Sequence, residues 1–129
     1  SDRDITGGGV EVEFFGEKTT LPAGPATLAL RTGAALLPSA AYFTDRGVGH
    51  LGFIGAPMNC ERHGKLREDV QRITQEMAYE LETLIRRAPE QWHLLQPNWP
   101  SDPGYGIDHQ NSHPAETHPS ETHPSETIE

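Results

Sequence analysis

Two adjoining segments, Val10-Glu-Val-Glu-Phe-Phe-Gly-Glu17 and Leu21-Pro-Ala-Gly-Pro-Ala-Thr-Leu-Ala-Leu-Arg-Thr-Gly33, have the sequence patterns of a strand and of a helix. Apolar and acidic residues alternate in the first segment, which predicts a half-buried strand that ends at Gly16. Pro25 favours a helix start, because a proline there gives up only a donor that would be unpaired anyway. Gly33 ends that helix. The sequence therefore predicts a strand that passes through an acidic loop into a helix, as in α/β proteins that present side chains at the carboxyl edge of a sheet.

The following segment predicts a β-hairpin. The apolar run over residues 34–43 is typical of a buried strand, and Pro38 within it indicates an edge or a bulge. Residues 44–47 have the composition of a turn, and residues 48–54 predict a second short strand. Because only that turn separates the two strands, we expect them to pair with each other.

A long helix is predicted over residues 66–87, after a loop at 55–64. Its apolar residues recur three and four positions apart, its first turn contains acids and its last turn contains arginines. Pro89 ends the helix, because proline cannot continue the backbone hydrogen bonding. One further apolar turn or strand at 90–95 would then close the domain.

The predicted fold class is α/β, with the order strand, helix, strand, strand, helix over about 100 residues. Such a sheet is small for a free-standing α/β domain, so we expect further strands upstream in a longer protein. Trp92 and Trp99 fit either a membrane interface or an aromatic contact that closes the domain. Of these two roles we expect the aromatic contact.

The charge of the chain is concentrated in its last residues. The formal net charge is −9, and residues 101–129 contain six acids but neither lysine nor arginine. The first hundred residues carry ten bases and thirteen acids without a basic stripe, so we expect no nucleic-acid partner. A proline-containing five-residue unit then repeats from His113, His118 and His123, which predicts a disordered tail. Imidazoles there could bind zinc or nickel, but without fixed geometry we expect no metal site.

Three acidic residues beside the first predicted strand, Glu11, Glu13 and Glu17, form the densest acidic group in the body of the chain. A carboxylate near a strand end can orient a histidine and stabilise its imidazolium during proton transfer. For any one of them, a solvated strand face or loop is the commoner explanation. His63 and Glu68 lie five positions apart, but they straddle a predicted helix start, where Glu68 is explained as a first-turn charge.

Three stretches together resemble a known enzyme family. They are Asp2-Arg-Asp4 leading to Gly9-Val-Glu-Val-Glu-Phe-Phe-Gly-Glu17, then Pro22-Ala-Gly-Pro-Ala-Thr-Leu-Ala-Leu-Arg-Thr-Gly-Ala34, and Arg86-Arg-Ala-Pro-Glu-Gln-Trp-His93. In this order and spacing they resemble the C-terminal half of bacterial membrane-associated lipid acyltransferases of the lipid A lauroyl/myristoyl type. Within that family they most resemble the actinobacterial branch that acylates phosphatidylinositol mannosides. The resemblance covers residues 1–99, which would be part of the acyltransferase domain, with 100–129 as the tail.

The resemblance implies a fold, a reaction and a location. The fold is an α/β glycerolipid-acyltransferase-like sheet flanked by helices. The reaction moves a fatty acyl chain from an acyl-CoA donor to a sugar hydroxyl of a glycolipid acceptor, a phosphatidylinositol mannoside, without a cofactor. The protein would be peripheral, on the inner, cytosolic face of the cytoplasmic membrane.

The resemblance also implies which residues take part. In the family, a histidine followed after four residues by an aspartate supplies the general base, and a glutamate further along supports that histidine. This sequence contains no such pair, so we expect the histidine upstream and no transferase activity from the isolated chain. For the supporting glutamate we favour Glu17, because of its predicted loop position, and keep Glu13 as a second candidate. A substrate-binding role is expected at Asp2, Arg3 and Asp4, which match the family's turn before this strand.

Two other functions are open on the sequence alone. The first is the lipid A branch of the same family, with an acyl-carrier protein as donor; the Asp2-Arg-Asp4 turn and the acidic pattern at Glu11 and Glu13 resemble the mannoside branch more. The second is a non-catalytic scaffold or membrane-binding module, which would also lack the histidine.

Overall fold

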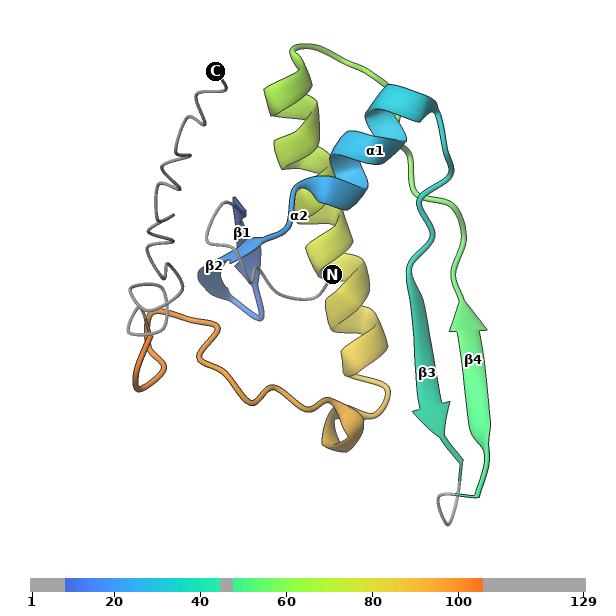
Figure 1. Cartoon of the computed structure of the whole chain (residues 1–129), viewed down its shortest axis with the longest axis vertical. Helices are drawn as coiled ribbons and strands as arrows, with labels where there is room; N and C mark the ends of the chain where they lie inside the picture. Colours follow the sequence, from blue (N-terminus) through green and yellow to red (C-terminus); the bar gives the residue numbers. More distant parts are fainter. Residues whose placement is uncertain (1–8, 45–47, 106–129) are drawn as a thin grey trace, which may run out of the picture.

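The chain forms two antiparallel β-hairpins and two α-helices, a mixed α/β arrangement that confirms the predicted class (Figure 1). The structure is a computed structural model that describes residues 9–44 and 48–105. Its elements, in chain order, are β1 (Val10–Phe14), β2 (Glu17–Leu21), α1 (Gly24–Thr32), β3 (Ser39–Phe43), β4 (His50–Ile54), α2 (Leu66–Ile85) and the short 3-10 helix η2 (Pro89–Gln91).

The first hairpin contains a second strand, β2, that the sequence pattern did not predict. β1 pairs with β2 in antiparallel register, so that Phe14 lies opposite Glu17. The two residues between them, Phe15 and Gly16, both have positive φ values, 52° and 81°, as a two-residue hairpin turn requires. The prediction that Glu17 lies in a loop leading to the helix is therefore wrong. Gly16 does end β1, but it does so by turning the chain back into β2.

The hydrophobic core lies between this hairpin and α2. Val12, Phe14 and Leu21 pack against Met77 and Ala78 of α2. These three strand residues lie on the same face of the hairpin, because side chains alternate along each strand. The predicted apolar face of the strand is therefore confirmed.

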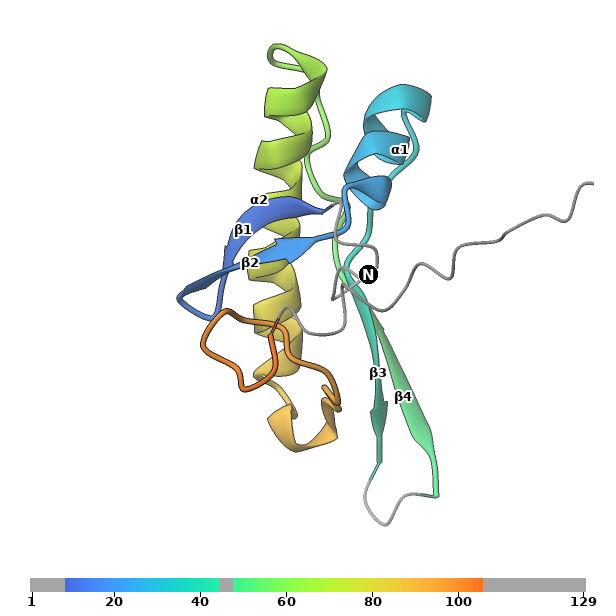
Figure 2. The ribbon, with the colours of Figure 1, turned by 60° about the vertical axis from the view of Figure 1, so that its left-hand side comes forward.

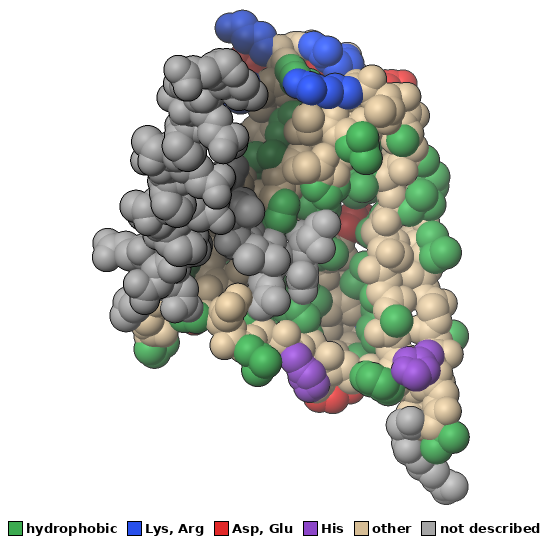
Figure 3. All heavy atoms as spheres, viewed as in Figure 1, with side chains coloured by type: hydrophobic (Ala, Val, Ile, Leu, Met, Phe, Trp, Pro, Cys, Tyr) green, Lys and Arg blue, Asp and Glu red, His purple; other side chains and the backbone are tan. Residues whose placement is uncertain are grey.

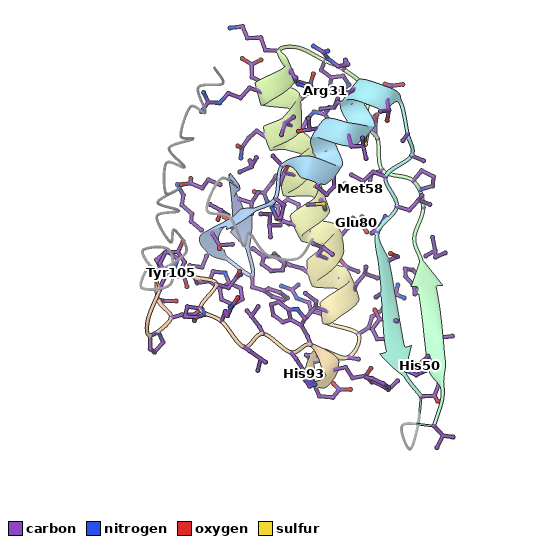
Figure 4. The ribbon with its side chains drawn as sticks, viewed as in Figure 1. Arg31, His50, Met58, Glu80, His93 and Tyr105 are labelled. Carbon is purple, nitrogen blue, oxygen red and sulfur yellow. The ribbon has the colours of Figure 1, made fainter. Side chains whose placement is uncertain are left out.

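A second part of the core joins the two helices. Ala26 of α1 packs with Val70 and Ile73 near the beginning of α2. Met58, from the loop after β4, packs against both clusters and lies between the helices in Figure 4. Gly33, with φ of 72°, donates its N–H to the carbonyl of Ala29 and ends α1, as expected for a glycine in this position.

Four aromatic rings close the end of the core. Phe14 and Phe15 lie 4.8 Å apart between ring centroids, and Trp92 and Trp99 each contact both of them. The indole Nε1 of Trp99 donates a hydrogen bond of 3.0 Å to the carbonyl of Phe14. The guanidinium of Arg86 lies 5.3 Å from the centre of the Phe15 ring. The expected domain-closing aromatic contact is therefore confirmed.

Side chains of α2 close the outer edge of β1. Alternate residues of β1 direct their N–H and C=O groups away from β2, and Gln75 binds both such groups of Glu13, each at 2.8 Å. Gln71, one helical turn earlier, donates to a preceding β1 carbonyl. One of the carboxylate oxygens of Glu82 accepts the N–H of Phe15 at 2.7 Å. This edge is therefore occupied by α2 and is closed to another strand.

The second hairpin is only partly as predicted. β3 pairs with β4 in antiparallel register, which confirms the predicted pairing. The strand is confined to the second half of the apolar run, and residues 34–38 before it are not strand. The expected burial is wrong, since alternate residues of β3 are exposed and Leu51 and Ile54 of β4 are 61% and 72% exposed. The apolar composition predicted a strand buried on both faces, but the described residues bury only one face of this hairpin.

The long helix matches its prediction, ending at Ile85, two residues earlier than expected. Of the turn or strand predicted at 90–95, only the beginning coincides with an element, the 3-10 helix Pro89–Gln91, and residues 92–95 are neither helix nor strand. Among the described residues, no helix combines the length and the apolar character needed to cross a bilayer.

The described chain ends in a turn that folds back onto the first hairpin. The carboxylate of Asp102 accepts the N–H groups of Asn98 and Trp99 at 2.7 and 3.0 Å. Thr19 of β2 donates its hydroxyl to the carbonyl of Asn98. The rest of the predicted tail, including His113, lies outside the described residues, as do His118 and His123.

Candidate functional site

The candidate site is the solvent-facing side of β1, opposite its buried face. Glu11 and Glu13 are both exposed there, two residues apart on the same face. Lys18 lies directly opposite Glu13 in the hairpin, but its amino group binds Glu11 at 2.9 Å. That hydrogen bond, together with the charge of Glu11, raises the pKa of Lys18. No described residue donates a hydrogen bond to the Glu13 carboxylate, although Gln75 binds both the N–H and the C=O of Glu13. The backbone of Glu13 is therefore fixed, and its carboxylate can accept a hydrogen bond from another group.

Glu17 has a different environment. It is half-buried at the beginning of β2, and its two carboxylate oxygens accept the N–H and the hydroxyl of Ser101 at 3.1 and 2.7 Å. These contacts hold the terminal turn against the hairpin. The carboxylate of Glu17 is thus already engaged, whereas that of Glu13 is not.

No described histidine reaches either glutamate. His50, His63 and His93 are exposed, and none has a contact with Glu13 or Glu17. Figure 4 shows His50 at the far end of the β3–β4 hairpin, away from β1 and β2. The predicted substrate-binding residues Asp2, Arg3 and Asp4 lie outside the described residues. The described part of the chain therefore presents a carboxylate without an imidazole.

The predicted spacing of His63 and Glu68 does not produce a pair. The neighbouring acid, Asp69, instead accepts the backbone N–H groups of His63 and Gly64, each at 3.2 Å. Asp69 is 2% exposed, and its carboxylate lies 3.4 Å from Arg72. Burial by itself raises the pKa of Asp69, but the two N–H donors and Arg72 outweigh it, so the pKa lies below its usual value. The first-turn charge pattern predicted acids here but did not indicate that Asp69 would hold the preceding loop.

This depressed pKa of Asp69 predicts a pH-dependent contribution to stability. The ionised carboxylate stabilises the fold above the ordinary pKa of an aspartate, about 3.9, and that contribution is lost as the pH falls through the lower pKa of the folded state. The variant Asp69→Asn should therefore unfold at a lower temperature at pH 7 and lose less stability on acidification below pH ~4. Thermal unfolding from pH 7 to pH 2 measures both effects. Glu68→Gln, an exposed first-turn neighbour, is the charge control, and identical profiles for wild type and Asp69→Asn would contradict the assignment.

Other chemistries have little support from the described side chains. Burial first, and then the charge of Glu76, raise the pKa of the Cys60 thiol despite the opposing effect of Arg72, so its thiolate form is disfavoured. Within residues 9–44 and 48–105, no three His, Cys, Asp or Glu side chains are grouped to hold a metal ion.

The chain belongs to the bacterial lipid A biosynthesis acyltransferase family, whose model matches residues 1–101. It is 44% identical over 102 residues to phosphatidylinositol mannoside acyltransferases of two Mycobacterium tuberculosis strains, CDC 1551 and H37Rv. It is 43% identical over the same length to the phosphatidylinositol mannoside acyltransferase of Mycolicibacterium smegmatis. These matches cover 79% of this chain but only 30% to 31% of each relative. The chain therefore spans less than a third of the length of the proteins that it matches.

Proposed function

We propose that this chain is part of an acyltransferase that moves a fatty acyl group from acyl-CoA to a sugar hydroxyl of a phosphatidylinositol mannoside. The observation that carries the proposal is the 44% identity to proteins named for that acceptor, over 79% of this chain. The branch that acylates lipid A is the second candidate, because the matching family is described by lipid A biosynthesis.

The proposed reaction forms an ester and breaks a thioester. The acceptor hydroxyl oxygen attacks the thioester carbonyl carbon, and a base takes the hydroxyl proton as the C–O bond forms. The carbon–sulfur bond then breaks, and the departing CoA sulfur takes up a proton. Because no described histidine lies beside the candidate carboxylates, the histidine base would come from the larger part of the acyltransferase that this chain does not span.

Within this reaction we assign Glu13 as the carboxylate that supports the histidine. A carboxylate hydrogen-bonded to an imidazole fixes the orientation of the ring and stabilises the imidazolium that forms when the base takes the proton. Glu13 suits that role because Gln75 binds its backbone N–H and C=O, while its carboxylate is exposed and has no described donor. Glu17 fits a bracing role instead, because Ser101 already binds both of its oxygens. Asp2, Arg3 and Asp4 stay candidates for the acceptor side of the site.

The proposed location is the cytosolic face of the cytoplasmic membrane, with the protein bound peripherally. A lipid acceptor must be reached at a membrane surface. Arg31, Arg62, Lys65 and Arg67 are exposed, and Figure 3 shows Lys and Arg side chains gathered at the end where α2 begins. Basic side chains at one end would be attracted to anionic lipid headgroups.

The reaction can be tested with a complete acyltransferase that contains this segment. The enzyme is supplied in parallel with phosphatidylinositol mannoside and with a lipid A precursor, each with acyl-CoA and with acyl-carrier protein as donor. We expect the phosphatidylinositol mannoside to gain the mass of one acyl group from acyl-CoA, at a rate at least ~10-fold above the other combinations. Preferential acylation of the lipid A precursor would support the second candidate, and no transfer to either acceptor would support a non-catalytic module.

A further inference from the structure

No described strand pairs with the outer edge of β3. In the β3–β4 pair, Gly55 donates to the carbonyl of Pro38 and Thr44 donates to the carbonyl of Gly49. Because hydrogen-bonded pairs alternate in an antiparallel ladder, these contacts direct the backbone groups of the intervening odd-numbered residues away from β4. Among the described residues, the outward N–H and C=O groups of Ser39 and Ala41 have no hydrogen-bond partner.

The rest of that edge and the edge of β1 are closed by glutamine side chains. Gln91 accepts the N–H of Phe43 at 2.7 Å and donates to its carbonyl at 3.2 Å. Gln75 does the same for Glu13 on β1. Side chains thus satisfy the outward backbone groups at both of these places, whereas no described residue satisfies those of Ser39 and Ala41. An unpaired strand edge of this kind is a template for another strand.

An apolar groove lies beside the open edge. It has a volume of about 220 Å³ and runs between β3 and the last turns of α2. Leu81, Leu84 and Ile85 line its helix side. Figures 1 and 2 both show β3 between α2 and β4, so the open edge lies on the side of the helix and the edge of β4 lies on the outside. A strand added here could bind the backbone of β3 and place alternate apolar side chains on α2.

The hairpin also lacks cover elsewhere. Apolar side chains line its arm in Figure 3, and Phe43 is 55% exposed. An isolated two-stranded hairpin is at best marginally stable in water. The chain spans only 30% of the length of its relatives, so a complete acyltransferase contains more sequence that could cover this hairpin. A relative about three times as long contains further chain from which a strand could be added to this hairpin.

We propose that a β-strand from the remaining part of the acyltransferase domain pairs with the open edge of β3 at Ser39 and Ala41. This strand lies in the groove, with one apolar face on Leu81, Leu84 and Ile85, and it makes β3 an interior strand of a larger sheet. The inference rests on family membership rather than on the proposed reaction. The proposed acyl transfer can therefore be correct if the proposed strand pairing is wrong, and the strand pairing can be correct if the acyl transfer is wrong.

Residue-resolved hydrogen exchange tests the proposal without any substitution. The amide exchange of Ser39 and Ala41 is compared between the 129-residue chain and a complete acyltransferase that contains it. We expect both amides to exchange at least ~100-fold more slowly in the complete protein. The amides of Ala40 and Tyr42, which face β4 in both proteins, serve as internal controls.

Three outcomes would overturn the proposal. Equal exchange rates for Ser39 and Ala41 in the two proteins would show that no strand adds at this edge. New protection at Gly52 and Ile54, whose backbones face outward on β4, would show that the partner uses the opposite edge. Protection of Ser39 and Ala41 that rises with the concentration of the 129-residue chain alone would show that a second copy occupies the edge instead.

Discussion

Replacing Phe14 by alanine is expected to lower the free energy of unfolding by about 3–5 kcal/mol, the usual cost of deleting a buried aromatic side chain. Phe14 is fully buried, and its ring contacts Phe15, Trp92 and Trp99 at centroid distances of 4.8, 6.0 and 5.9 Å. The variant would leave a cavity where the first hairpin, α2 and the terminal turn meet. Urea unfolding of the 129-residue chain, followed by far-ultraviolet circular dichroism, measures the change.

A matched control separates burial from apolar character. Leu28, on α1, is a large apolar side chain that is 62% exposed, so Leu28→Ala should change the stability by no more than about 0.5 kcal/mol. If Phe14→Ala cost as little as Leu28→Ala, the core would not be centred on the first hairpin and α2.

The helices could be predicted because their signals are local. Pro25 and Gly33 delimit α1, and the apolar spacing from Leu66 onward defines α2. These features depend on neighbours within one or two turns, so they need no knowledge of the rest of the fold. The pairing of β3 with β4 could be predicted equally well, because one short turn separates the two strands.

The second strand of the first hairpin had no such signal. Its turn is Phe15-Gly16, and a bulky residue at positive φ is rare where Asn-Gly or Asp-Gly is usual. The strand that follows, Glu17–Leu21, is mostly polar. Phe15 is held in this conformation by its ring contacts and by Glu82, which lies 67 positions away and accepts its N–H. Only the tertiary structure provides these contacts.

The environment of Glu17 also depends on residues far away in the sequence. The sequence predicts a loop at Glu17, but this residue begins β2 and binds Ser101, which is 84 positions away in the sequence. The burial predicted for residues 34–43 depended on a covering layer that the described chain provides only in part. Both predictions were wrong because the environment of these residues depends on parts of the sequence that lie far from them.

Glu13→Gln is expected to lower the turnover number of the complete acyltransferase by about 100-fold or more, the range in which acid–base assistance contributes. The substitution keeps the size of the side chain and its backbone contacts with Gln75, but it removes the charge that would stabilise an imidazolium. A 100-fold loss corresponds to about 2.7 kcal/mol of transition-state stabilisation. The Michaelis constants for donor and acceptor should change little, because Glu13 is assigned to the histidine and not to either substrate.

The most direct test of the proposed site is the steady-state rate of acyl transfer to phosphatidylinositol mannoside, measured side by side for wild type, Glu13→Gln and Glu17→Gln. The Glu17→Gln side chain keeps an oxygen that can accept a hydrogen bond from Ser101. This variant should therefore retain turnover within a few-fold of wild type. We predict a large loss for Glu13→Gln alone. A larger loss for Glu17→Gln, or wild-type turnover for Glu13→Gln, would contradict the assignment of the supporting carboxylate to the exposed face of β1.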